Sequence, residues 1–192
     1  MLDGLIAESK AELDYIDSVI EALARCDSMA ALEGIRAELT AAGYLRGRGG
    51  ERKPQKVTAA PLSFVSPGGM TVLVGRNNLE NDTLTLRTAD KTDLWFHTLK
   101  IHGSHTVLRC GGREPAEADI LFAAALAAYY SKARQSDRVA VDYTRVQYVK
   151  KPSGARPGMV IYTHQKTVYV TPTAPSGEGK NIVPLPHGRI LS

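Results

Sequence analysis

Residues 93–109 read DLWFHTLKIHGSHTVLR and place three histidines close to the only tryptophan, Trp95. His97, His102 and His105 are nitrogen ligands of the kind that zinc prefers, but a zinc site needs three or four ligands that converge. Residues 98–108 contain no acidic residue, and neither cysteine of the chain lies in a zinc-type spacing. The sequence therefore predicts no metal site and no cofactor.

The same stretch allows a catalytic interpretation. A catalytic histidine needs a nucleophile and an orienting carboxylate. Ser104 adjoins His105, and Asp93 lies nearby in sequence, but there is no GxSxG motif. An enzyme that acts on RNA through His97 and His105 remains an alternative, although no catalytic residue is predicted.

A surface that binds RNA is a third interpretation of this stretch. Flat rings such as Trp95 and His97 can stack on unpaired bases, while Asp93 and Ser104 can form hydrogen bonds. The competing interpretation places Trp95 on a strand that faces the core, with the histidines as its neighbours. The stretch alone does not separate these two readings.

Two further segments carry groups suited to nucleic acid. Arg76, Asn77 and Asn78 follow Gly75, which is typical of a turn but also of contacts to phosphates and base edges. Residues 132–156 hold seven basic residues against two acidic ones, which indicates either a phosphate-binding face or a solvated charged surface. The candidates from this segment are Lys132, Arg134, Lys150 and Lys151.

The elements that position these residues are predicted to form an α+β domain over residues 57–172. Short β-type runs flank one Ala/Leu-rich helix over Ile120–Tyr130, with Pro115 near its start. This order favours a mostly antiparallel sheet with one long buried helix. The expected strands are Leu62–Val65, Thr71–Val74, Thr83–Arg87, 93–97, 105–109, Val139–Tyr143, Val146–Val149, Met159–Tyr162 and Thr167–Val170.

Residues 1–45 are predicted to form a helical arm, either a hairpin or the stump of a coiled coil. Ile6, Leu13 and Ile20 repeat every seven residues, which makes a narrow apolar seam that needs a partner helix. Self-association through residues 2–39 is one way to supply it. Ser28 is expected to cap a second helix that Gly43 closes. Residues 46–56 are expected to form a basic linker and residues 173–192 an irregular tail.

Composition and charge narrow the class of protein. Residues 1–50 carry nine acids and five bases, whereas residues 51–192 carry eleven acids and nineteen bases. A basic domain beside an acidic arm predicts a polyanionic partner for the domain. No apolar run is long enough to span a bilayer, and the acidic N-terminus lacks the basic region of a signal peptide, so a cytoplasmic protein is expected.

Taken in order, five segments resemble the C-terminal NFACT-R domain of the NFACT family. The segments are VGRNNLEND, DLWFHTLKIHGSHTVLR, AAYYSKARQS, VAVDYTRVQYVKKPSGARPGMVIY and KTVYVTP, and together they cover roughly residues 57–172. The arm resembles the end of the coiled coil that precedes this domain in the family. The residues that match family motifs are Arg76, Asn77, Asn78, Asp93, Trp95, His97, Gly103, Ser104, His105, Lys132, Arg134, Lys150, Lys151, Gly154 and Gly158. One departure is His102, where the family commonly has proline.

The resemblance implies an RNA-binding module of ribosome-associated quality control. Family members bind large ribosomal subunits that carry stranded peptidyl-tRNA and support template-free addition of alanine, while the ribosome itself makes the peptide bond. The implied partners are ribosomal RNA, transfer RNA or both. The family's large N-terminal domain and helix-hairpin-helix segment have no counterpart here, so tailing is not expected of this chain alone. A fibronectin-binding, adhesin-like protein is the alternative that some family names suggest.

Overall fold

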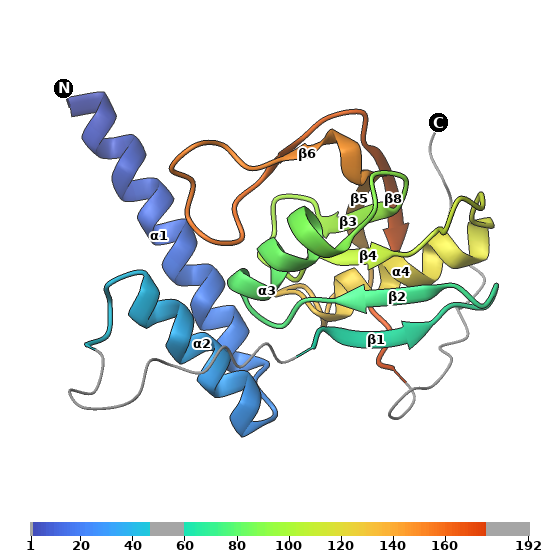
Figure 1. Cartoon of the computed structure of the whole chain (residues 1–192), viewed down its shortest axis with the longest axis horizontal. Helices are drawn as coiled ribbons and strands as arrows, with labels where there is room; N and C mark the ends of the chain where they lie inside the picture. The colour runs from blue at the N-terminus through green and yellow to red at the C-terminus, as the bar shows by residue number, and fades with distance from the viewer. Residues whose placement is uncertain (1, 47–59, 176–192) are drawn as a thin grey trace.

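The computed structural model describes residues 2–46 and 60–175, which form a helical arm packed against an α+β domain (Figure 1). The predicted α+β class with its mostly antiparallel sheet is confirmed. Of the predicted basic linker only Arg46 is described, and the predicted tail beyond residue 175 also lies outside the described residues.

The arm is a pair of helices, α1 (Leu2–Ala24) and α2 (Met29–Ala41). Ser28 caps α2 as predicted, because its hydroxyl oxygen accepts a hydrogen bond of 3.2 Å from the amide of Ala31. Gly43 follows the end of α2 with φ at +83°, a conformation that glycine adopts without strain. The predicted helical hairpin is therefore present.

The two helices of the arm do not meet along the predicted seam. Ile6, Leu13 and Ile20 are 45%, 62% and 56% exposed. The buried cluster of the arm packs another face of α1, with Tyr15, Val19 and Ala22, against Ile35 of α2. The seam thus remains open to solvent within the described part of the chain.

Six strands form the main sheet in the order β1-β2-β4-β3-β5-β8, and every neighbouring pair is antiparallel. The strands are β1 (Leu62–Val65), β2 (Thr71–Val74), β3 (Leu94–Thr98), β4 (Thr106–Leu108), β5 (Val139–Arg145) and β8 (Lys166–Val170). A separate two-stranded ribbon pairs β6 (Val149–Lys150) with β7 (Ile161–Tyr162).

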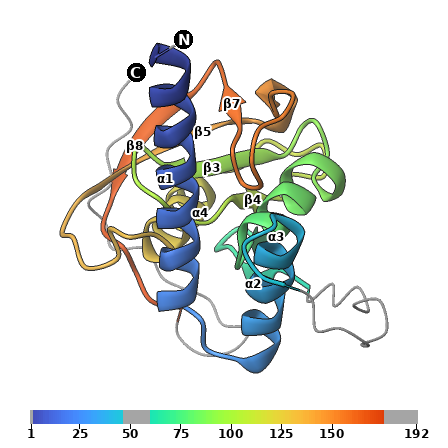
Figure 2. The same ribbon diagram turned by 90° about the vertical axis from the view of Figure 1, so that its left-hand side faces the viewer.

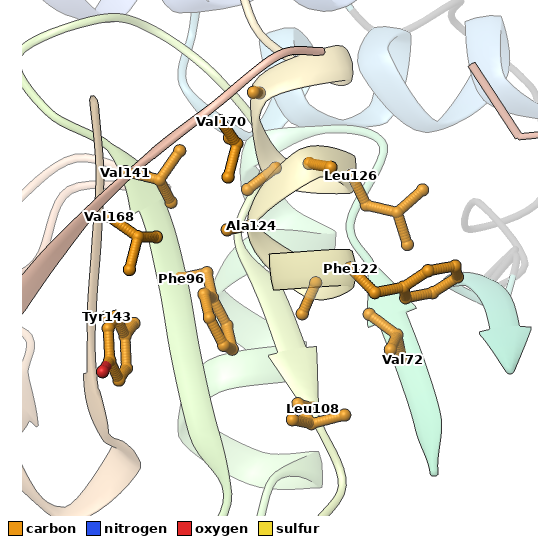
Figure 3. Packing of buried hydrophobic residues seen from close by; sticks show 14 of the residues in the cluster. Val72, Phe96, Leu108, Phe122, Ala124, Leu126, Val141, Tyr143, Val168 and Val170 are labelled. Atoms are coloured by element: carbon orange, nitrogen blue, oxygen red, sulfur yellow. The ribbon is translucent and has the colours of Figure 1, made fainter. Parts of the chain in front are cut away.

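Helix α4 (Glu117–Tyr129) covers one face of this sheet and is buried, as the Ala-rich sequence predicts. Small alanine side chains let the helix approach the strands closely, while Phe122 and Leu126 fill the remaining space (Figure 3). Phe96 from β3 and Leu108 from β4 meet them from the sheet. This cluster is the main hydrophobic core of the domain.

The opposite face of the sheet carries a second, smaller core. Neighbouring residues of a strand point to opposite faces, so Trp95 faces away from α4 while Phe96 faces toward it. Short α3 (Asn78–Thr83), the π-helical turn η1 (Leu84–Thr88) and the β6–β7 ribbon surround this face. The buried members of this second core are Leu84, Trp95, Val107, Val146 and Val149.

Two predicted strands are wrong. Residues Thr83–Arg87 complete α3 and form η1, where Leu84 and Thr85 are both buried. Asn77 caps the start of this helical segment by accepting a hydrogen bond from the amide of Glu80, and the amide of Ala89 closes the π-helical turn on the carbonyl of Leu84 at 2.9 Å. Val146–Tyr148 form the 3₁₀ turn η2, which places Val146 and Val149 on one side of the backbone and buries both.

Candidate nucleic-acid interface

Asp93 of the D-x-W-x-H motif lies inside the domain and organises a turn. Its carboxylate is fully buried and accepts hydrogen bonds from the amides of Cys110 at 2.8 Å and Asp90 at 2.9 Å. The Nε of Arg109 lies 2.8 Å from the same carboxylate. These contacts occupy the Asp93 carboxylate, so Asp93 holds this turn in place.

Trp95 is also interior, with 1% of its surface exposed. Its ring lies in the second core, and the ring of Tyr162 packs against it at 4.9 Å between centroids. Trp95 cannot stack on an RNA base from this position. The competing interpretation of the sequence, a tryptophan on a strand facing the core, is the one that the structure favours.

His97 and His105 are brought together around Trp95, as pairing of their strands predicts. Their ring centroids lie 5.7 Å apart at right angles, and His97 is stacked on Trp95. His105 Nδ1 lies 2.8 Å from the hydroxyl of Thr85, and its ring is 2% exposed. Burial lowers the pKa of His97 to about 4 and that of His105 to about 3, so both rings are neutral at neutral pH. His105 has no surface with which to reach an RNA substrate.

Arg76 and Asn77 precede α3, and Asn78, its first residue, joins the domain to the arm. Asn77 caps α3 by accepting a hydrogen bond from the amide of Glu80, and the guanidinium of Arg76 pairs with the Glu80 carboxylate at 3.1 Å. Asn78 donates from its side chain and its backbone to the buried carboxylate of Glu38 in α2. The polar groups of this motif are thereby engaged within the chain.

Ser104 makes a second joint between the arm and the domain. The guanidinium of Arg25, at the end of α1, donates to the Ser104 hydroxyl at 2.8 Å and to the carbonyl of Tyr130 at 2.7 Å. The joints at Ser104 and Asn78 hold both helices of the arm against one edge of the domain (Figure 2).

The two lysines of the basic loop have different roles. The Lys151 ammonium group lies 2.9 Å from the Asp82 carboxylate and 2.6 Å from the carbonyl of Arg156. It therefore fixes the loop over α3. Lys150 precedes it on β6 and is exposed.

Lys132 and Arg134 are exposed in the turn that follows α4. The backbone amide of Lys132 donates to the carbonyl of His102 at 2.9 Å, so the turn is fixed while its side chains face solvent. Of the residues that the sequence nominated for RNA contact, only Lys132, Arg134 and Lys150 are exposed; the others are wholly or partly buried.

Sequence reasoning missed Arg25 and Glu38, the arm residues that bind the predicted site. Neither lies in a motif, and their partners are 79 and 40 residues away. The only local signal is a carboxylate at position 38 on the inward side of α2, close to the buried Ile35.

The described residues contain no cluster of three or more histidine, cysteine, aspartate or glutamate side chains that could hold a metal ion. Within the same ranges, no helix is long and apolar enough to cross a lipid bilayer.

Comparison with protein families matches residues 61–164 to the family described as NFACT protein RNA binding domain. The chain is 44% identical over 176 residues to the Rqc2 homolog RqcH of Bacillus subtilis (strain 168), covering 91% of this chain and 30% of that protein. It is 43% identical over 175 residues to the protein of the same name from Streptococcus suis (strain 05ZYH33), covering 90% and 31%. The chain thus spans about a third of the length of these relatives.

A solved structure has the same arrangement. It is the C-terminal of the fibronectin/fibrinogen-binding protein from Streptococcus suis, which superposes with a TM-score of 0.84 at 42% identity. The match covers 90% of this chain and 68% of that one. The matched 90% is a larger part of the chain than the α+β domain contains. The match therefore includes the helical arm, which belongs to the shared fold.

Proposed function

Because the chain belongs to the family of NFACT protein RNA-binding domains, we propose that it is a non-catalytic RNA-binding module that acts in ribosome-associated quality control. The family match over residues 61–164 is the observation that carries this proposal. The name RqcH, shared by relatives that are 43–44% identical, supports the quality-control role.

The finer proposal concerns the partners. We expect the chain to contact ribosomal RNA, transfer RNA or both on large subunits obstructed by peptidyl-tRNA. In a longer protein that contains it, the module would support template-free addition of alanine to the nascent chain. Catalysis of peptide-bond formation would remain with the ribosome.

The exposed cations Lys132, Arg134 and Lys150 are the proposed phosphate contacts among the predicted residues. Among the described residues, none of these three side chains forms an ion pair or hydrogen bond, whereas Lys151 would have to leave the Asp82 carboxylate to bind a phosphate. Binding through such contacts releases counterions and weakens steeply as salt rises.

The exposed seam of α1 supports a role for the arm as a helical partner surface. Ile6, Leu13 and Ile20 form an apolar stripe that a second helix can cover, either from another copy of the chain or from a longer coiled coil. Self-association through residues 2–39 and a cytoplasmic location are part of the proposal.

Co-sedimentation of the purified chain with ribosomal particles tests the proposal. Empty large subunits, subunits bearing peptidyl-tRNA and whole ribosomes should be compared at low and moderate salt. We expect salt-sensitive pelleting with large subunits and a preference for obstructed ones. No pelleting at low salt, together with no binding to free RNA, would refute the RNA-binding role.

Fibronectin binding is the second candidate function, because the solved structure with 42% identity is described as part of a fibronectin/fibrinogen-binding protein. Binding of the purified chain to immobilised fibronectin, and surface labelling of the protein on intact cells, distinguish the two functions. Saturable fibronectin binding with surface exposure would favour the adhesin-like role, and its absence would leave the RNA-binding role alone.

A further inference from the structure

With Trp95 buried, a stacking contact to RNA must come from another aromatic side chain. Tyr148 and His164 form a stacked pair with their centroids 4.3 Å apart and their planes at 26°. His164 is exposed and Tyr148 is partly exposed. Tyr148 covers one face of the histidine and the Nδ1 edge lies 2.9 Å from the Thr163 hydroxyl, so the opposite face of the ring is the one that can stack on a base.

The backbone around this pair is fixed. The amide of Thr163 donates to the carbonyl of Tyr148 at 3.2 Å, which extends the pairing of β6 with β7. The amide of Gln147 donates to the carbonyl of Lys91 at 3.2 Å and ties the turn η2 to the loop before β3. His164 has φ at +57°, which turns the chain directly after the ribbon.

The reverse side of the ribbon is anchored in the second core. Val149 is buried there, and Tyr162 packs on Trp95 while its hydroxyl donates to Asp142 at 2.9 Å. The ribbon lies on the side of the sheet away from α4, at the top of Figure 1. The rings of Tyr148 and His164 are therefore held in place before any ligand arrives, which reduces the entropy lost on binding.

The charge around the pair is positive. Residues 143–170 contain five basic residues and no acidic one. Three of the five, Arg145, Lys151 and Arg156, lie within 4 Å of a carboxylate on another segment. Among the described residues no such partner is found for Lys150 or Lys166, two residues from Tyr148 and His164 respectively. Both lysines are exposed and can follow a phosphate backbone past the rings.

We propose that the Tyr148–His164 pair is a stacking platform for an unpaired RNA base, with Lys150 and Lys166 contacting the flanking phosphates. This inference rests on the proposed RNA-binding function and specifies its site. The ligand is single-stranded because the base faces of a continuous duplex are covered by neighbouring pairs and cannot reach the rings.

Fluorescence anisotropy of the whole chain with a labelled adenosine strand of about 12 nucleotides tests the platform. Tyr148→Leu keeps apolar volume but removes the ring, and His164→Asn removes the ring while tolerating the positive φ. We expect each to weaken binding about 5- to 100-fold, with an unchanged dependence on salt. Tyr148→Phe keeps the ring and should bind within about two-fold of the wild type.

Two controls separate stacking from general damage. Duplex RNA of the same length should bind the wild type and both ring-removing variants equally. Tyr169→Ala removes another partly exposed ring, which lies on β8 beneath the guanidinium of Arg138. This variant should bind single-stranded RNA with unchanged affinity. All variants should keep the wild-type thermal unfolding curve to within a few degrees.

The outcomes distinguish this inference from the proposed function. If the wild type binds single strands and the variants bind equally well, the platform is wrong while RNA binding stands. Loss with Tyr169→Ala alone would place the stacking contact on β8 and also overturn the platform. If the wild type binds neither single strands, duplexes nor ribosomal particles, the proposed function fails together with this inference.

Discussion

Acid should destabilise this domain through His105. The ring is buried beside Thr85 and Trp95 and stays neutral because burial lowers its pKa from 6.5 to about 3. An unfolded chain binds a proton at this histidine below about pH 6.5, whereas the folded chain does not until about pH 3. The stabilisation is therefore complete above about pH 6.5 and is lost as the pH falls from there toward 3.

The size of the effect follows from the width of this window. Each pH unit below 6.5 costs about 1.4 kcal/mol per histidine, so about pH 5 removes roughly 2 kcal/mol of the free energy of unfolding. His97 changes stability in the same direction, because burial lowers its pKa to about 4. Glu38 acts in the opposite sense, because burial raises its pKa and protonation relieves the cost of burying its charge.

Urea unfolding of the wild type and of His105→Asn, at about pH 7.5 and about pH 5, isolates the His105 contribution. The buried Trp95 is the only tryptophan and reports unfolding by its fluorescence. Asparagine keeps a polar atom near Thr85 but cannot be protonated in this range. We expect the loss of stability between the two pH values to be about 2 kcal/mol smaller in the variant, even though the variant is less stable at both. Equal losses in the two proteins would refute the neutral, buried histidine.

Further substitutions test the joints, the core and the loop. Asn78→Ala should lower the free energy of unfolding by about 1–3 kcal/mol in urea titrations, because it removes the side-chain amide that donates to the buried Glu38 carboxylate and leaves only the backbone donor of residue 78. Phe122→Ala should cost about 3–5 kcal/mol in the same titration, because the ring is fully buried between α4 and the sheet. Lys151→Ala should cost about 1 kcal/mol, because its ammonium group holds the loop. Lys150→Ala should leave stability unchanged and make the negative slope of log affinity against log salt on single-stranded RNA shallower by about 0.7.

Periodicity and capping residues were sufficient to predict most of the fold. The Ser28 cap, the buried Ala-rich helix and most strands depend on local patterns that the sequence displays directly. The strand predicted over Thr83–Arg87 failed because β-type composition is a weak local preference. At that position, the side-chain cap at Asn77 starts a helical segment that continues through the turn over Leu84–Thr88.

The candidate site was predicted less well than the fold, for a different physical reason. Asparagine, aspartate and serine are usually exposed, so a polar motif suggests a binding surface. Asp93, Asn78 and Ser104 are instead buried, and each is satisfied by groups 17 to 79 residues away in sequence. No local pattern reveals such partners, because they meet only when the arm and the sheet have assembled.

The position of these motif residues changes how a loss of RNA binding has to be interpreted. A substitution at Asn78 removes the side-chain donor to the buried Glu38 carboxylate, and one at Ser104 removes one acceptor of the partly buried Arg25 guanidinium that follows α1. Either change loosens the arm and lowers stability, so weaker RNA binding would follow without any contact between those residues and RNA. Within the described part of the chain, no hydrogen bond or ion pair joins the side chains of Tyr148, His164 or Lys150 to the arm, so a loss of affinity at unchanged stability would identify the interface there.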